Sequence, residues 1–334
     1  MHTLSRLAVG LLIVAGISST REASAYVHTV TPQGCHELHW AKSCVFLTAD
    51  ASGSSDMPLE DVERITRQAV SSWSTATASE SFLRLDYVAA SGPREAASDA
   101  WQVIKFRTDT WCHPADATGP AICYDASATA LTTVSYVNDA SDPANDGRIL
   151  DADIELNAVG NFFYDADSGK PVGAGERRPM DLRNTLTHEL GHLQGLDHTC
   201  RASAWSMPAC TRDGKGDEVV DCADVEAHHA TDASLGAVYA STMYPSAQPS
   251  ETDKRTPKTD DIAAIASLYP TSEDPNICAM PGEEPAAAVA TPPTARAGCS
   301  ASRASGTGGW SWMAVLGLVA LARRRRLLYT RHAP

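Results

Sequence analysis

The sequence predicts an α+β domain, and three observations support this class. From Leu59 onward, apolar residues recur at offsets of three and four, which is the period of a helix with one buried face. Residues 101–106 alternate between apolar and polar, and residues 130–137 are rich in β-branched side chains, as strands are. A second helical stretch follows these strands. It starts near Asp181 and ends near Gly195, with leucines as its apolar anchors.

The elements follow one another with clear boundaries. The first strand is expected at Trp40–Leu47, ahead of the helix that starts at Leu59. The buried stripe of that helix is formed by Val62, Ile65, Ala69 and Trp73. Three more strands are predicted, at Trp101–Phe106, Ala130–Val137 and Arg148–Asn157. The second helix begins at Asp181 as N-cap, or just before it, after Pro179.

The second helix carries histidines with the spacing of metal ligands. His188 and His192 are four residues apart, so both imidazoles project from one helix face, about one turn apart. Gly195 stands where a helix often ends in a left-handed residue, after which the chain can bring His198 to the same ion. Three histidines and one open position are typical of a catalytic zinc site. Glu189 lies beside the first ligand, where it can take a proton from water at the metal.

The pattern H-E-x-x-H-x-x-G-x-x-H over residues 188–198 resembles the zinc signature of the metzincin metallopeptidases. The second mark of that family is a methionine turn beneath the metal, and the matching segment here is Ser241–Pro245, with the sequence STMYP. Thr259–Pro270 resembles the last helix of the matrixin branch. Astacin-like and serralysin-like relatives have a tyrosine near the zinc, two residues after the methionine. That position holds Pro245, so no tyrosine ligand is implied.

The resemblance implies a zincin-like catalytic domain over residues 26–272. Such a domain has a twisted, mostly parallel sheet with an antiparallel edge strand, a zinc-binding active-site helix and a C-terminal helix. In this family the sheet edge pairs with an extended peptide, and the strands within residues 130–157 are the candidates for that edge. The implied function is a zinc-dependent metalloendopeptidase that acts on a protein or peptide. The implied roles are metal ligation by His188, His192 and His198, proton transfer by Glu189, and a floor beneath the metal from Met243.

Other functions stay open at this stage. A surface-displayed adhesion or binding module on a zincin scaffold would be favoured by loss of Glu189 or of a histidine ligand, and all four residues are present. The motif also permits zinc-dependent hydrolysis of a non-peptide bond. Calcium is a second possible cofactor, since matrixins commonly bind it, although aspartates also suit turns and caps and none here has EF-hand spacing. The aspartates concerned are Asp139, Asp142, Asp146, Asp151, Asp153, Asp165 and Asp167.

The segment between His198 and Met243 is longer than a compact matrixin needs. These 44 residues contain three cysteines and the pair His228-His229. The insert either shapes the substrate pocket or forms a disulfide-linked surface excursion. Five further histidines are not expected to be ligands, because three already complete the site. They are His36, His39, His113, His228 and His229.

The charge is distributed unevenly along the chain. Of the net charge of −14, residues 1–25 carry +1 and residues 299–334 carry +6, so that residues 26–298 carry −21. An acidic body of this kind repels phosphate backbones and argues against nucleic acid as a partner. We expect the protein to be a monomer that acts on a protein or peptide substrate.

Both ends of the chain have the features of an exported protein. Residues 1–25 read as a signal peptide, with Arg6, an apolar run from Leu7 to Ile17, and small residues before Tyr26. Eight of the nine cysteines precede residue 279 and could form four disulfides in an oxidising compartment. Close spacing predicts the pairs Cys35–Cys44 and Cys112–Cys123. The pairing of the other four, Cys200, Cys210, Cys222 and Cys278, is left open.

The C-terminal part changes in composition. Residues 273–298 read as an Ala/Pro-rich linker. Residues 299–334 contain Cys299, a short apolar run at residues 309–322 and an arginine cluster, a layout that resembles the sorting signals of myxobacterial exported proteins. Such a segment would interact with the membrane or with the sorting machinery, and Cys299 would be a processing or lipid-attachment site. A simple C-terminal membrane anchor is the alternative. The protein is thus expected at the cell surface, at the outer membrane or outside the cell.

Overall fold

The computed structural model describes residues 25–115, 119–202, 207–282 and 295–298. The predicted signal peptide up to residue 24, part of the predicted linker and the predicted sorting segment at residues 299–334 lie outside these ranges. Within the described ranges, none of the helices has the length and apolar character that crossing a membrane requires.

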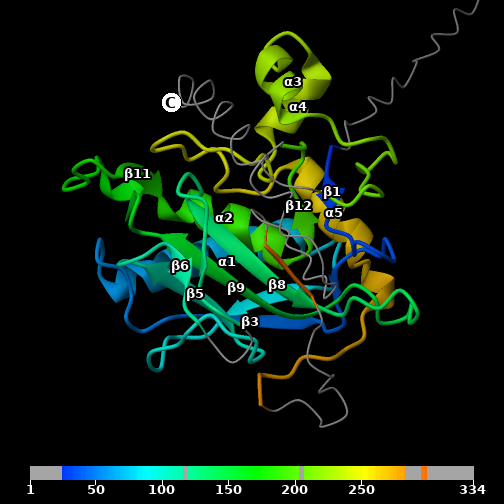
Figure 1. The fold of residues 1–334 in the computed structure, drawn as a ribbon, viewed down its shortest axis with the longest axis horizontal. Helices are drawn as coiled ribbons and strands as arrows, with labels where there is room; N and C mark the ends of the chain where they lie inside the picture. The colour runs from blue at the N-terminus through cyan, green and yellow to red at the C-terminus, as the bar shows by residue number, and fades with distance from the viewer. Residues whose placement is uncertain (1–24, 116–118, 203–206, 283–294, 299–334) are drawn as a thin grey trace, which may run out of the picture.

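A seven-stranded, mostly parallel sheet forms the centre of the molecule (Figure 1). Its strand order is β13-β8-β9-β5-β3-β4, and β2 pairs with β9 outside this path. The strands are β2 (His39–Trp40), β3 (Cys44–Ala49), β4 (Arg84–Tyr87), β5 (Gln102–Arg107), β8 (Ala130–Tyr136), β9 (Arg148–Asn157) and β13 (Ala295–Gly298). The pairs β4–β3, β3–β5, β5–β9 and β2–β9 are parallel, whereas β8 runs antiparallel to β9. The expected mostly parallel sheet with an antiparallel strand is therefore confirmed, but β13 covers the outer side of that strand.

Three short strand pairs lie outside the central sheet. They are β1 (Val27–His28) with β12 (Leu196–Asp197), β6 (Cys112–His113) with β7 (Ile122–Cys123), and β10 (Asn161–Tyr164) with β11 (Arg178–Asp181). The helices are α1 (Leu59–Thr77), α2 (Leu182–Leu193), α3 (Cys222–His228), α4 (Ala233–Ala240) and α5 (Thr259–Leu268). Two short 3₁₀ turns, η1 (Ala166–Ser168) and η2 (Thr271–Glu273), complete the described elements.

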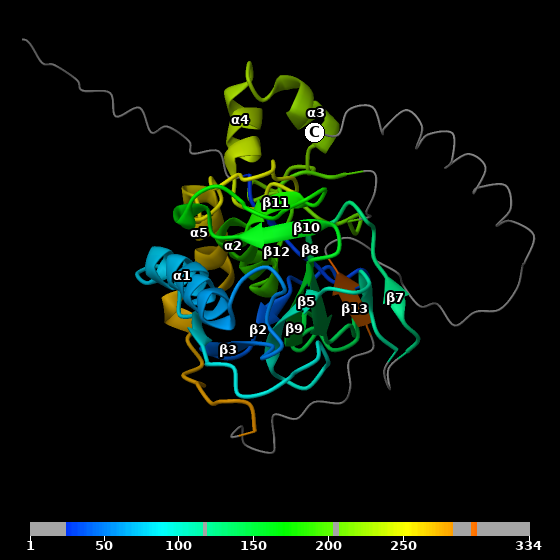
Figure 2. The same cartoon turned by 90° about the vertical axis from the view of Figure 1, so that its left-hand side faces the viewer.

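The core lies between the sheet and the helices α1, α2 and α5. The predicted stripe of α1 is buried in full, and it belongs to the same hydrophobic cluster as Ile154 and Leu156 of β9. On α2, Leu186, Leu190 and Leu193 have no exposed surface. The insert after the third histidine forms α3 and α4, which project at one end of the molecule in both views (Figures 1 and 2). A small separate cluster around Val225 and Val238 supports that projection.

Four disulfides link the described cysteines, as their number predicts. They are Cys35–Cys210, Cys44–Cys278, Cys112–Cys123 and Cys200–Cys222. The predicted pair Cys112–Cys123 is confirmed, and it joins the paired strands β6 and β7. The predicted pair Cys35–Cys44 is wrong. Cys35 lies in a turn with a positive φ of 59°, whereas Cys44 begins β3 and contacts the segment after α5, so nearness in sequence did not bring their sulfurs together.

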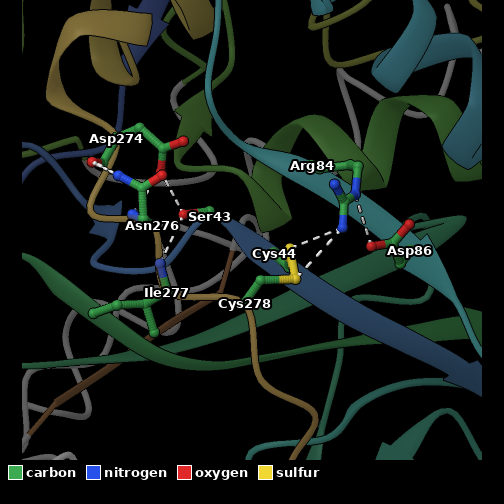
Figure 3. The surroundings of a disulfide bond; sticks show 8 residues. All are labelled: Ser43, Cys44, Arg84, Asp86, Asp274, Asn276, Ile277 and Cys278. Atoms are coloured by element: carbon green, nitrogen blue, oxygen red, sulfur yellow. Dashed lines mark hydrogen bonds and ion pairs between the residues drawn. A yellow bond between two sulfur atoms is a disulfide. The ribbon is translucent and has the colours of Figure 1, made fainter.

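Hydrogen bonds and a disulfide join the segment after α5 to the start of β3 (Figure 3). The Ser43 backbone N–H donates to the Ile277 carbonyl at 2.7 Å, and the Ile277 N–H donates to the Ser43 hydroxyl at 3.0 Å. Arg84 Nη2 lies 3.1 Å from Cys44 Sγ, next to the bond with Cys278. The chain therefore stays attached to the start of β3 as far as Cys278.

Candidate metal centre

The helix that carries the predicted ligands has a well-defined start. Asp181 is its N-cap, as predicted, and its Oδ1 accepts a hydrogen bond from the Asn184 N–H at 2.7 Å. Arg255 Nη2 pairs with Asp181 Oδ2 at 2.6 Å, so the buried carboxylate has a cation partner as well. A capped and charge-paired start fixes the rotation of α2 and hence the direction of its histidines.

The end of α2 is held by side chains from distant elements. Trp40 Nε1 donates to the Leu193 carbonyl at 2.8 Å, and the Tyr269 hydroxyl donates to the Gln194 carbonyl at 2.7 Å. Gly195 follows with φ +100°, and a Cβ there would lie 2.3 Å from the Leu38 carbonyl oxygen. Only glycine fits this turn, which redirects the chain into β12 and towards His198.

The three predicted ligands converge. His192 Nε2 lies 3.2 Å from His188 Nε2 and 3.1 Å from His198 Nε2. Three ligands of a tetrahedral ion at about 2.0–2.1 Å would stand about 3.3 Å apart, so the spacing fits a single small cation. Within the described ranges, two groups of three or more potential metal ligands are found, and these histidines are the one without a disulfide. The other group is Cys44, Asp86 and Cys278, whose sulfurs are bonded to each other.

The protonation state of the imidazoles also suits the binding of a metal ion. His188 Nδ1 donates to the Thr242 carbonyl at 2.7 Å, and His192 Nδ1 donates to the Leu196 carbonyl at 2.8 Å. Burial lowers the pKa of His192 to about 4, and burial followed by neighbouring imidazole charge lowers the pKa of His188 and of His198. These rings are therefore neutral near pH 7. With their protons on Nδ1, the Nε2 lone pairs of His188 and His192 face each other, an arrangement that a shared cation relieves.

Glu189 follows His188 on α2, and its carboxyl group is bound by β8. Its Oε2 accepts a hydrogen bond from Thr132 Oγ1 at 2.6 Å, and both residues are buried. Burial raises the pKa of Glu189 to about 7, against the opposing effects of the Thr132 hydrogen bond and the Lys254 charge. A carboxyl group that titrates near neutrality can both accept and return a proton. The sequence motif identifies Glu189, but a threonine in a β-branched strand gives no separate signal for Thr132.

The methionine turn lies directly under α2. A Cβ at Gly191 would stand 2.2 Å from Met243 Sδ, so this helical glycine makes room for the methionine. Met243 is buried, and the preceding carbonyl, that of Thr242, holds His188. Asp261 of α5 accepts hydrogen bonds from the Thr242 N–H at 3.1 Å and from the Lys258 N–H at 2.7 Å. The turn thus connects the last helix to the histidines.

A buried lysine near the site is not predicted by the sequence. Lys254 has 5% of its surface exposed, and its Nζ donates to the carbonyls of Tyr244, at 2.8 Å, and of Ser246. Burial lowers its pKa to about 8, with Glu251 as the main opposing charge. Lys254 therefore shapes the chain that leaves the methionine turn. Nothing in a lysine-containing polar loop distinguishes it from a solvent-exposed residue.

The other candidate residues have protein partners. Asp146 accepts hydrogen bonds from Thr31 and His36, and Asp165 and Asp167 pair with arginines. In the described ranges the seven aspartates considered for calcium form no metal-binding group. The five extra histidines stand outside the three-histidine group. His113 contacts Glu155, for example, and His229 stacks on Tyr239 with ring centroids 3.9 Å apart.

Comparison with models of known protein families gives no match for this chain, and comparison with curated proteins gives none either. The interpretation of the site therefore depends on its residues and their geometry. A buried group of three histidines that could bind a metal ion is present, and Glu189, which follows His188 on α2, has a raised pKa. The four disulfides suggest an extracellular or otherwise oxidising environment.

Proposed function

We propose that this protein is a matrixin-like zinc-dependent metalloendopeptidase that is exported and acts at the cell surface or outside the cell. One observation carries the proposal: His192 Nε2 lies 3.2 Å from His188 Nε2 and 3.1 Å from His198 Nε2, and the three buried, neutral imidazoles form one group that could hold a metal ion. An all-imidazole set without thiolate or carboxylate suits Zn²⁺ in a catalytic rather than a structural site. A tetrahedral ion on three protein ligands keeps one position for water or substrate.

The chemical role of each residue follows from the position of its side chain. When bound, zinc supplies a Lewis acid that activates water and polarises the scissile carbonyl. Glu189 accepts the proton of the attacking water and then delivers it to the departing amine. Thr132 holds the Glu189 carboxyl group against β8, and the Thr242 carbonyl orients His188. Met243 supports α2 from below and takes no part in proton transfer.

The nearby sheet supports a peptide as the substrate. β8 contacts α2 and carries Thr132, so its backbone runs past the site. An extended peptide can pair with the outer edge of such a strand, which β13 occupies here, through its main chain while its side chains occupy pockets on alternate sides. This mode of recognition places an amide carbonyl near the metal without requiring a particular sequence.

The test compares the exported chain with a Glu189→Ala variant and a Glu80→Ala control, which removes an exposed acid in the turn after α1. Cleavage of a reduced, unfolded protein and bound zinc are measured in all three. We expect about one zinc per chain throughout, with cleavage lost only in Glu189→Ala, by a factor of 10² or more on the scale typical of a lost general base, roughly 10²–10⁴.

Two outcomes would contradict the proposal. A parent chain without bound zinc would remove its basis. A parent that binds zinc but cleaves neither unfolded proteins nor peptide libraries would instead favour the alternative of a surface-displayed binding or adhesion module on a zincin scaffold.

A further inference from the structure

The outer side of β8 is occupied by a strand from the far end of the chain. β13 pairs antiparallel with β8, with Ala295 opposite Tyr136 and Gly298 opposite Thr133 (Figure 2). The predicted linker therefore contributes a strand to the central sheet. Its Ala/Pro-rich composition gives no strand signal, because the pairing uses backbone groups that every residue except proline offers.

β13 runs towards the part of β8 that contacts the metal centre. Gly298 lies opposite Thr133, and the next residue of β8, Thr132, donates to Glu189. Ala295, at the other end of β13, lies opposite Tyr136. Tyr136 is three residues, or about 10 Å along the strand, further from Thr132 than Thr133 is. The backbone of β13 thus takes up the strand edge that leads directly to the catalytic carboxyl group.

We propose that residues 295–298 are a tethered strand that blocks the peptide-binding edge of β8 and so restricts access of substrate to the metal centre. This inference rests on the proposed function, since it takes the β8 edge to be where a substrate backbone pairs. Two strands cannot use the same row of N–H and C=O groups, so β13 and a substrate exclude each other there.

The Cys44–Cys278 disulfide keeps this strand close to its binding edge. Sixteen residues separate Cys278 from Ala295, and four strand spacings, about 19 Å, separate β3 from β13 across the sheet. Sixteen residues can reach about 50 Å when extended, so the tether spans this distance without strain. For a segment of this length that joins the strand covalently to the domain, an effective concentration of about millimolar is expected. A four-residue strand that would bind weakly as a free peptide therefore competes in the intact chain.

The position of the strand also matters for maturation. All four paired residues precede Cys299 in the sequence, where processing is expected. Removal of the segment that begins at Cys299 would leave β13 on the mature protein. Restriction of the site by this strand therefore does not depend on the sorting segment.

The test weakens the pairing in the full exported chain by the double substitution Arg296→Pro and Ala297→Pro. Successive N–H groups of a strand point to opposite sides, so one of the two prolines removes a donor to β8. The matched control is Ala287→Pro with Ala288→Pro, in the Ala/Pro-rich part of the chain outside the described residues. Cleavage of a reduced, unfolded protein is measured together with backbone hydrogen exchange of residues 130–136.

The double variant is expected to cleave about three- to tenfold faster than the parent, as removal of a weak tethered competitor implies. Alternate amides of β8 should exchange faster in this variant alone. A synthetic peptide of sequence TARAG at millimolar concentration should restore both the protection and the slower cleavage.

Unchanged protection of β8 in the double variant would overturn the inference. Loss of protection with an unchanged cleavage rate would also overturn it, since the strand would then not obstruct substrate. If none of the chains cleaves any substrate, the proposed function fails, and the exchange measurement still decides whether β13 covers β8.

Discussion

Two groups of buried ionisable side chains lie close together in this domain, and they resolve their burial differently. One is the metal centre on α2. The other is on the far face of β9, where alternation directs Asp151, Asp153 and Glu155 away from the helices while Ile154 joins the core. His192 and Glu155 are both almost completely buried. One group consists of neutral imidazoles that could bind a metal ion, and the other contains a carboxylate paired with an arginine of the protein itself.

On the outer face of β9, burial and neighbouring protein groups determine the charge of each carboxyl group. Burial raises the pKa of Glu155, but hydrogen bonds from His113 and Tyr124 and the charge of Arg107 outweigh it, so its pKa lies below the ordinary value. Burial, and then the charge of a neighbouring aspartate, raise the pKa of Asp151 to about 7 and that of Asp153 as well. Glu155 is thus ionised and paired, while burial makes both aspartates bind a proton more tightly than a free carboxyl group does. At the metal centre the burial of the three histidines is met instead by loss of charge, because burial lowers the pKa of each imidazole.

The largest expected effect is at the metal centre. A chelator should abolish cleavage and lower the free energy of unfolding by about 4 kcal/mol, if free zinc had stood about 1,000-fold above its dissociation constant. Thermal unfolding with and without the chelator measures this. A His192→Ala variant is the control, because it should show little response. An equal shift in both proteins would place the stabilising ion elsewhere.

The next effect tests the internal pairing of Glu155. Arg107 is 8% exposed, and its Nη2 lies 2.5 Å from Glu155 Oε1. Arg107→Met leaves a buried carboxylate without its cation and should cost about 3 kcal/mol in urea unfolding, with His113 and Tyr124 limiting the loss. Arg64→Met removes exposed ion pairs and should cost at most about 1 kcal/mol. Similar costs for the two variants would show that Arg107 is not the deciding partner.

A smaller effect of opposite sign is expected at Asp153. Burial and the charge of Asp151 hold its folded pKa well above the ordinary aspartate value, so the folded state binds the proton more tightly than the unfolded state. The stability due to this proton is complete below about pH 4 and is lost as the pH rises through the folded pKa. Asp153→Asn should therefore stabilise the domain by about 1–3 kcal/mol at pH 8 and have little effect near pH 3. A gain that is the same at both pH values would contradict this reasoning.

The smallest effect concerns the contact between the sheet and the metal centre. Thr132→Val removes the hydrogen bond that opposes the raised pKa of Glu189, so more of this carboxyl group is protonated at pH 7. Cleavage at pH 7 should fall about two- to tenfold, and the acidic limb of the pH–rate profile should move to higher pH. Thr132→Ser keeps the hydroxyl group and should restore the profile. A reduced rate with an unmoved acidic limb would assign Thr132 a packing role only.

Sequence periodicity predicts much of the fold because its signals are local. The stripe of α1, the cap at Asp181 and the turn at Gly195 all depend on residues within a few positions of one another. The convergence of the histidines is likewise largely set by one helix and one turn. Non-local pairings leave no such trace: β4, the helices of the insert and the partner of Cys35 were not anticipated. Thr132 and Lys254 belong to this second group, since only tertiary packing brings them to the site.

Two of the disulfides bear on the order in which the domain can be completed. Cys35–Cys210 and Cys44–Cys278 span 175 and 234 residues, so each joins an early part of the chain to a late one. During synthesis or passage through a membrane channel, the early cysteines emerge while their partners are still absent. They must stay reduced, or be released from wrong partners, until nearly the whole domain has arrived. A compartment that supplies disulfide exchange as well as oxidation is therefore part of what this chain requires to reach its folded form.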